Sequence, residues 1–206
     1  MDIANETGVV ILSGGNSARM NYPKAFLNLS NITLIEYLLK KYINTRLNKL
    51  VIVLNYKLFN DKFSEIINEL KSKSVIVKNS NPENGRIYSL KLGLNELKYN
   101  KFCFIQNIDN PVVDEILLNK MMKNAKEDSY VAPLYKGKSG HPVLIGSNII
   151  NQIIKNTDLN LTLKDLLSPF KRIDVDSDGL NVLENINTQQ DWANYIQKQK
   201  ENAKHN

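Results

Sequence analysis

Apolar residues along the first two-thirds of the chain form short continuous runs that alternate with longer amphipathic segments. The runs are rich in Val, Ile, Leu and Phe, which is typical of strands buried on both faces of a parallel sheet. Between the runs, apolar residues recur at helical spacing. This alternation predicts βαβ units and an α/β fold: a single-domain, Rossmann-like open sheet, mostly parallel, with helices on both faces. Strands are predicted over 8–13, 50–54, 75–77, 101–106 and 130–134, and helices over 32–43, 58–70, 86–97 and 112–125.

The pattern loosens after residue 135. Thr162 and Asp165 have the spacing of a capping box, in which a hydroxyl and a carboxylate each accept a terminal amide hydrogen of a helix. We find no repeat, linker or domain boundary, so we predict one domain over 1–206 with a core at 8–193 and a polar tail at 198–206. The later predicted elements are strands over 142–145 and 172–175 and helices over 147–154, from Thr162 onward and over 188–199.

Composition limits the classes of function. The chain has 206 residues, of which 42% are hydrophobic, enough to bury the core of one α/β domain. The net charge of +6 suits anionic ligands, but the lysines are scattered, so we expect no nucleic-acid binding. The single Cys103 excludes an internal disulfide framework and a multi-cysteine zinc site. Because neither a signal segment nor an apolar run near the ~20 residues of a membrane helix is present, we expect a cytoplasmic protein that does not bind membranes.

The segment 11–27 carries the strongest functional signal. Its apolar run leads into the adjacent glycines Gly14 and Gly15, and Arg19 and Lys24 follow. Adjacent glycines let the backbone approach a ligand closely. Two cations just downstream suit an anion with several phosphates. A nucleoside triphosphate is therefore the natural candidate, and a strand-to-helix turn with two solvated cations is the simpler alternative.

The spacing in this segment differs from the better-known phosphate loops. A Walker A loop needs Ser or Thr after its lysine, whereas Ala25 follows Lys24, and the dinucleotide fingerprint needs a third glycine well before Gly85. The remaining pattern, L-x-G-G-x-S-x-R-M-x-x-P-K-A-x-L, resembles the signature of the MobA-like nucleotidyltransferases. This family contains the molybdenum cofactor guanylyl- and cytidylyltransferases. The resemblance implies a nucleotide-diphospho-sugar transferase-like fold.

The loop after the strand at 101–106 contains Asp109 and Pro111. An acidic residue at the carboxyl end of a strand can hold Mg²⁺, which takes oxygen ligands and keeps several waters. Asp and Pro also favour turns for local reasons, so the pair by itself is a weak signal. The segment resembles the family's G-D-x-P motif, whose Asp binds the metal that bridges the nucleotide phosphates. Ile108 stands at the glycine position of that motif.

A second glycine-containing loop opens the helix predicted at 86–97. Asn81, Gly85 and Ser89 resemble the family's N-P-x-x-x-G stretch and the S-L-x-x-G-L stretch that follows it. The resemblance implies that these residues contact the nucleotide near its base and ribose. The alternative is an ordinary helix start with one loop glycine and the packing glycine Gly93.

Two further segments resemble the acceptor side of the family's cleft. Residues 140–142 resemble the G-H-P segment of the cytidylyltransferase branch, which implies that His141 positions the acceptor or a phosphate; the alternative is a turn with His141 half exposed. Asn185 and Asn187 resemble the N-I-N-T-P string of the guanylyltransferase branch. Asn187 offers Mg²⁺ a neutral carbonyl oxygen, a weaker ligand than a carboxylate. Thr188 is also a good helix N-cap, which explains part of the string without any function.

The resemblance thus implies an Mg²⁺-dependent enzyme that moves a nucleoside monophosphate from CTP or GTP to a phosphorylated acceptor and releases pyrophosphate. The implied acceptor is molybdopterin or the molybdenum cofactor, and a molybdoenzyme or cofactor-insertion protein is a candidate partner. The identity of the nucleotide base is left open, because the matched positions disagree. The guanylyl branch is matched by Gly14-Gly15 and by Asn185 with Asn187, and the cytidylyl branch by Pro23-Lys24 and by residues 140–142. Alternatives are a sugar- or polyol-phosphate nucleotidyltransferase and a nucleotide-binding protein with little or no turnover.

By this resemblance, Arg19 would bind the β- and γ-phosphates, Lys24 the α-phosphate or the attacking oxygen, and Asp109 the metal. These three are the predicted catalytic residues. The predicted nucleotide-binding residues are Leu12, Ser13, Gly14, Gly15, Asn81, Gly85 and Ser89. The predicted acceptor-side residues are His141, Asn185 and Asn187, and the predicted metal ligands are Asp109 and Asn187.

Overall fold

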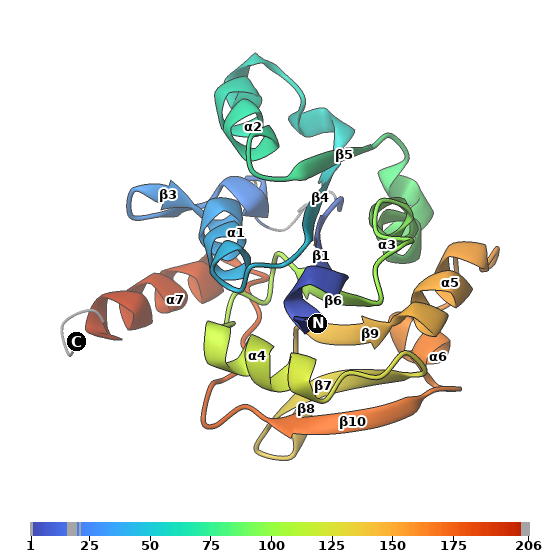
Figure 1. Cartoon of the computed structure of the whole chain (residues 1–206). Helices are drawn as coiled ribbons and strands as arrows, with labels where there is room; N and C mark the ends of the chain where they lie inside the picture. Colours follow the sequence, from blue (N-terminus) through green and yellow to red (C-terminus); the bar gives the residue numbers. More distant parts are fainter. Residues whose placement is uncertain (1, 16–19, 21, 203–206) are drawn as a thin grey trace.

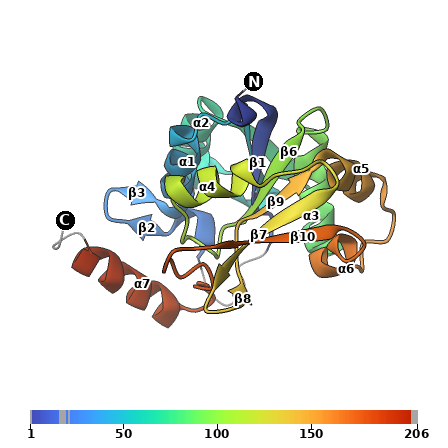
Figure 2. The same ribbon diagram turned by 60° about the horizontal axis from the view of Figure 1, so that its bottom comes forward.

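The centre of the molecule is an eight-stranded sheet with the order β10-β7-β9-β6-β1-β4-β5, to which β8 is added beside β7. Figures 1 and 2 show a computed structural model of the chain, which describes residues 2–15, 20 and 22–202. β1 lies between β4 and β6 and is parallel to both, and β5 is parallel to β4. The predicted open, mostly parallel α/β sheet is confirmed. The bounds of these strands are Thr7–Ser13 (β1), Lys49–Asn55 (β4), Val75–Asn79 (β5) and Phe102–Asn107 (β6).

One strand of the main sheet path runs against the others. β9 (Val143–Gly146) lies between β6 and β7 (Ser129–Tyr135) and is antiparallel to both. β10 (Lys171–Asp176) is again parallel to β7, and the short β8 (Lys138–Ser139) pairs with β7 antiparallel. Because β9 is reversed, its first residues lie at the edge where the parallel strands end. His141, just before β9, is therefore at the same edge as the carboxyl ends of β1 and β6.

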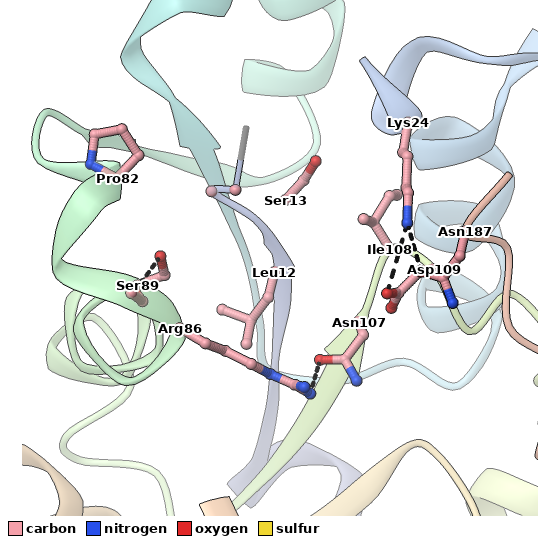
Figure 3. A pocket seen from close by; sticks show the side chains of 13 residues that line it. Leu12, Ser13, Lys24, Pro82, Arg86, Ser89, Asn107, Ile108, Asp109 and Asn187 are labelled. Atoms are coloured by element: carbon pink, nitrogen blue, oxygen red, sulfur yellow. Dashed lines mark hydrogen bonds and ion pairs between the residues drawn. The ribbon is translucent and has the colours of Figure 1, made fainter. Parts of the chain in front are cut away.

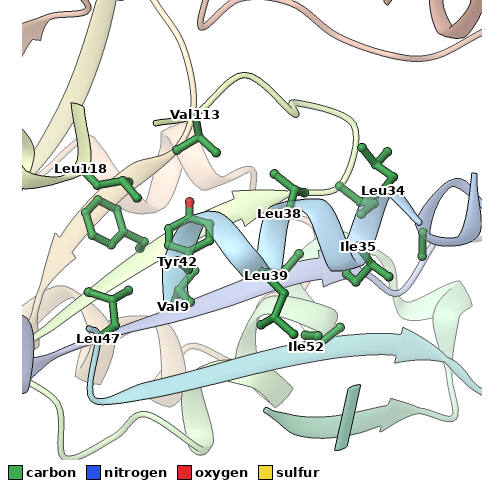
Figure 4. Close-up of a cluster of buried hydrophobic side chains, with 14 of the residues drawn as sticks. Val9, Leu34, Ile35, Leu38, Leu39, Tyr42, Leu47, Ile52, Val113 and Leu118 are labelled. Atoms are coloured by element: carbon green, nitrogen blue, oxygen red, sulfur yellow. The ribbon is translucent and has the colours of Figure 1, made fainter. Parts of the chain in front are cut away.

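Both faces of the sheet are covered, as the continuous apolar runs predict. Alternate residues of β1 enter different clusters, since Val9 and Ile11 pack on one face while Val10 and Leu12 pack on the other. Figure 4 shows α1 lying over the first face through Leu38 and its neighbours. The first face carries α1 (Leu34–Asn44), α2 (Ser64–Lys71) and α4 (Glu115–Lys123), and the second carries α3 (Gly85–Asn95), α5 (Ser147–Lys155) and α6 (Leu163–Leu167).

Two predicted helices begin later than the periodicity indicated. The helix predicted from residue 32 begins at Leu34, because β2 (Asn28–Leu29) and β3 (Ile32–Thr33) form a small hairpin and Thr33 caps α1. The helix predicted over 112–125 begins at Glu115, since the side chain of Asp114 accepts the hydrogen of the Leu117 backbone N–H at 2.7 Å. In both cases a capping side chain decided the start, and the amphipathic pattern alone did not reveal it.

Two other helices differ in length. Of the helix predicted over 58–70, only Ser64–Lys71 is α-helical, and short 3₁₀ turns at Tyr56–Leu58 and Asp61–Phe63 precede it. The closing helix α7 (Gln189–Asn202) continues into the segment predicted as a tail. The capping box predicted at Thr162 is present at the start of α6. Among the helices that the structure describes, none is long and apolar enough to cross a membrane.

The order of the strands determines where a ligand can bind. From β1 the chain passes through β4 to β5 on one side of the sheet, and α3 then returns it to β6 on the other side of β1. In open α/β sheets, ligands bind beyond the carboxyl ends of the strands where the strand order reverses. The edge formed by the ends of β1 and β6 is that position here.

Candidate active site

A cavity of about 450 Å³ opens at the carboxyl ends of β1 and β6 (Figure 3). It is lined by the ends of both strands, the glycine segment after β1, the first turns of α3, Lys24 and one residue from the loop before α7. Most of the residues predicted for the site therefore come together. The lining residues are Leu12, Ser13, Gly14, Gly15, Lys24, Pro82, Gly85, Arg86, Ser89, Asn107, Ile108, Asp109 and Asn187.

The glycine segment packs directly against the first turns of α3. A Cβ atom added to Gly14 would lie 2.7 Å from the hydroxyl oxygen of Ser89 and 3.1 Å from the amide nitrogen of Asn79. The Ser89 hydroxyl accepts a hydrogen bond from this amide at 2.9 Å and donates one to the Gly85 carbonyl at 3.3 Å. Gly14 thus permits a close approach that a larger residue would prevent. No atom of the described residues lies within 4 Å of a Cβ placed on Gly15.

This difference between adjacent glycines gives a testable expectation. Gly14→Ala should lower the free energy of unfolding by about 1–3 kcal/mol, the usual cost of an added methyl group in a tightly packed region. Gly15→Ala, the matched control, should change it by no more than ~0.5 kcal/mol, because the methyl group meets none of the residues that the structure describes. Urea denaturation of both variants measures the effect. Equal stability of the two variants would contradict the close packing of Gly14 on Ser89.

Lys24 lies on the opposite wall of the cavity and is only slightly exposed. Its side chain is 11% exposed, and its Nζ lies 3.1 Å from Oδ1 of Asn187 and 3.8 Å from Oδ2 of Asp109. Lys24 begins a 3₁₀ turn whose other residues, Ala25 and Phe26, are buried in the core. These buried neighbours explain why the ammonium group is held at the cavity wall.

The first turn of α7 positions Asn187. The backbone N–H groups of Asn187 and Thr188 donate to one carboxylate oxygen of Asp191 at 2.9 and 2.8 Å, and Thr188 accepts from the Asp191 N–H at 3.1 Å. The N–H of Asn187 is the first cause of a lowered pKa of Asp191, followed by the N–H of Thr188. The N–H of Ile186 donates to the Asp109 carbonyl at 2.8 Å, which ties this loop to the loop after β6. The loop that carries Asn187 is therefore bonded to Asp109 although the two segments are far apart in sequence.

The oxygens of Asp109 and Asn187 converge on one cation, the Lys24 ammonium. Carboxylate and amide oxygens around a positive charge are a donor set that suits Mg²⁺. Among the residues described, no group of three or more His, Cys, Asp or Glu side chains could hold a metal ion. A metal at this wall would accordingly take its remaining ligands from substrate phosphates and water.

Arg19, a predicted catalytic residue, is outside the described residues. Three other predicted site residues are described but do not line the cavity. Asn81 and Asn185 are exposed and do not line the cavity, and the Asn81 amide donates to the Tyr88 hydroxyl at 3.2 Å. His141 also does not line the cavity. Its Nε2 lies 3.1 Å from the amide nitrogen of Asn107, which does line it.

The sequence patterns did not identify Arg86 and Asn107, which form part of the cavity between Leu12 and Asp109 (Figure 3). Nη2 of Arg86 donates to Oδ1 of Asn107 at 2.5 Å. One signal was available, since a cation in the first turn of a helix is opposed by the helix dipole. Arg86, directly after Gly85 at the start of α3, is such a residue.

A mostly parallel sheet with a polar cavity at its topological switch point defines the class of open α/β proteins that bind their ligand at the ends of the strands. Within this class, the chain belongs to the family of the MobA-like NTP transferase domain, whose model matches residues 9–172. The chain is therefore a nucleotidyltransferase.

Individual relatives are distant but similar along their whole length. The molybdenum cofactor cytidylyltransferase of Escherichia coli (strain K12) is 21% identical over 183 residues, which cover 89% of this chain and 92% of the relative. A nucleotidyl transferase from Methanothermobacter thermautotroptrophicus has a TM-score of 0.76 at 18% identity, covering 93% of this chain and 96% of its own. Molybdopterin-guanine dinucleotide biosynthesis protein A from Archaeoglobus fulgidus has a TM-score of 0.68 at 18% identity, covering 94% and 99%. At these identities the two solved structures show a shared fold.

Proposed function

We propose that the protein transfers a nucleoside monophosphate from CTP or GTP to the phosphate of molybdopterin or the molybdenum cofactor, with Mg²⁺ and with release of pyrophosphate. One observation carries the proposal: the Lys24 ammonium lies between oxygens of Asp109 and Asn187 in the cavity that the glycine segment also lines. The names of the Escherichia coli and Archaeoglobus fulgidus relatives support the choice of acceptor.

In the proposed reaction, an acceptor phosphate oxygen attacks the α-phosphorus of the nucleotide in line. A new P–O bond to the acceptor forms as the bond to the β-phosphate oxygen breaks, and pyrophosphate leaves. Lys24 would exchange its contacts with Asp109 and Asn187 for an oxygen of the α-phosphate, where negative charge develops. Arg19 would bind the β- and γ-phosphates. The acceptor phosphate is ionised near neutral pH, so its attack needs no general base.

Asp109 and Asn187 would hold Mg²⁺, which when bound supplies positive charge against the phosphates. The backbone of Gly14 and Gly15 leaves room for the nucleotide beside β1, because neither residue has a side chain that projects into the cavity. Positioning and charge stabilisation are thus the two contributions that these residues would make to the rate.

A pyrophosphate-release assay across a panel of substrates tests this proposal. Each of the four common NTPs is combined with molybdopterin, with a sugar phosphate and with a polyol phosphate, in Mg²⁺ or in a chelator. We expect release with CTP or GTP, molybdopterin and Mg²⁺, and none with the chelator. In a parallel thermal-shift experiment, the preferred NTP at about 100 times its Kd should stabilise the fold by about 2.7 kcal/mol.

The panel separates the proposal from its alternatives. Release with a sugar or polyol phosphate and not with molybdopterin would overturn the proposed acceptor. Thermal stabilisation by an NTP without pyrophosphate release from any pair would favour a nucleotide-binding protein with little turnover. A protein indifferent to all four NTPs would contradict both the reaction and nucleotide binding.

A further inference from the structure

Arg86 supplies a second positive charge to the cavity, distinct from Lys24. Arg86 takes part in none of the ion pairs between described residues. Among these residues, its guanidinium donates a hydrogen bond to the neutral side chain of Asn107. A guanidinium has five N–H donors in a planar fork, and this bond uses one of them. Partial burial lowers the pKa of Arg86 from its usual value and the charge of Asp109 raises it, but arginine stays protonated. In Figure 3, Arg86 extends from α3 beneath Leu12 toward Asn107.

The orientation of Asn107 is determined by its neighbours. Its buried side-chain oxygen accepts from Arg86, so its amide nitrogen faces the opposite way, toward Oδ1 of Asn110 at 3.0 Å and Nε2 of His141 at 3.1 Å. A flipped amide would direct N–H donors at the guanidinium and its oxygen at Oδ1 of Asn110, so the bonds to Arg86 and Asn110 would be lost. Asn107 thus presents only an oxygen to Arg86.

His141 completes this arrangement behind Asn107. Since the Asn107 amide is a donor, Nε2 of His141 must accept, and the imidazole proton is on Nδ1. Burial and then the charge of Arg86 lower the pKa of His141 to about 4, which agrees with a neutral ring. A neutral His141 keeps the Asn107 oxygen directed at Arg86.

From this geometry we propose that Arg86 is a second phosphate-binding residue of the cavity, positioned by Asn107 and His141. Three observations support it: Arg86 lines the cavity, it has no described carboxylate partner at ion-pair distance, and a neutral amide holds one edge of its fork. A planar guanidinium with free donors suits two oxygens of one phosphate. Lys24, by contrast, shares its charge with Asp109.

The inference rests on the proposed function only for the source of the phosphate, which belongs either to the nucleotide or to the acceptor. Isothermal titration of the full chain distinguishes them. In the first titration, the ligand is CTP or GTP with Mg²⁺, and the corresponding free nucleoside is titrated for comparison. In the second titration, the ligand is inorganic phosphate, a probe of the acceptor site, and the protein is saturated with a non-hydrolysable α,β-methylene nucleotide.

Arg86→Gln removes the charge, and Asn107→Asp neutralises it by placing a carboxylate against an intact Arg86. Both variants should weaken one phosphate-bearing ligand by at least about tenfold, the effect of losing a charge-assisted hydrogen bond, and leave nucleoside affinity unchanged. Lys91→Gln is the matched control, because Lys91 is on the same helix but bonds to the Asn156 carbonyl away from the cavity. Its affinities should equal those of the wild type.

The ligand that weakens identifies the source of the phosphate. Weaker NTP binding assigns Arg86 to the nucleotide, and weaker inorganic phosphate binding with unchanged NTP binding assigns it to the acceptor. Equal losses for NTP and nucleoside, or unchanged affinities in both variants, overturn the proposal. If Arg86→Gln does not fold, Asn107→Asp and Arg86→Lys give the same readout, the latter with a smaller loss because charge is retained.

The positioning role of His141 is tested separately. His141→Gln, which can still accept from Asn107, should retain phosphate affinity, whereas His141→Leu should weaken it severalfold. Unchanged affinity in His141→Leu would overturn this role. Two results separate this proposal from the proposed reaction. If the wild type binds phosphates through Arg86 but releases no pyrophosphate, only the proposed reaction is contradicted. If Arg86→Gln has normal turnover and unchanged affinities, only the Arg86 proposal is contradicted.

Discussion

Replacement of Lys24 by alanine should lower kcat for pyrophosphate release by at least about 10²-fold, the scale of losing one charge contact made in the transition state. The ammonium group is the positive charge that lies between Asp109 and Asn187, at the wall where the α-phosphate is proposed to react. Initial rates at saturating NTP and acceptor measure the loss. The fold should persist, because the core contacts of this turn are made by Ala25 and Phe26.

Lys120→Ala is the control for this variant. Lys120 also pairs with an aspartate, Asp178, at 2.8 Å, but the pair lies on the surface away from the cavity. Exposed pairs of this kind contribute little to stability, so both turnover and fold should be unaffected. Activity of Lys24→Ala close to the wild type would remove the proposed mechanism.

Asp109→Asn should also lower turnover by at least about 10²-fold, and it should change the dependence of the rate on Mg²⁺. The substitution keeps the size of the side chain and replaces the one carboxylate among the described residues that line the cavity with a neutral amide. Mg²⁺ prefers carboxylate oxygens, so higher Mg²⁺ concentrations should be required for half-maximal rate. Titration of the rate with Mg²⁺ at fixed NTP measures both changes.

The matched control is Asp178→Asn, which removes the carboxylate of the surface pair with Lys120. It should leave the rate and the Mg²⁺ dependence unchanged. If Asp109→Asn loses activity with the same Mg²⁺ dependence as the wild type, Asp109 acts on something other than the metal. In that case the contact with Lys24 is the remaining explanation for its effect.

Periodicity predicted the sheet well because the central strands are buried on both faces. β1, β4 and β6 appear in the sequence as unbroken apolar runs, and helices of the predicted type lie between them. The direction of β9 could not be predicted, since its run of three apolar residues, Val143–Ile145, is the same pattern in either direction. Its antiparallel pairing with β6 and β7 depends on the path of the whole chain.

Motif spacing predicted one part of the cavity and missed another. Gly14, Lys24, Asp109 and Asn187 all line it, as the loops after the strands predicted. The contact of Arg86 with Asn107 depends on how α3 crosses toward β6, and no local pattern contains that information.

From the sequence alone, the alternation of apolar runs and amphipathic segments determined the α/β class, and the glycine segment with Lys24 and Asp109 predicted a phosphate-handling site at the strand ends. Both follow from local chemistry, because burial period and loop composition are properties of neighbouring residues. The tertiary structure alone decided that the Lys24 ammonium lies between Asp109 and Asn187, that His141 stands behind Asn107, and that Arg86 reaches the cavity. These contacts join segments far apart in the chain, so they exist only once the sheet has brought its strand ends together.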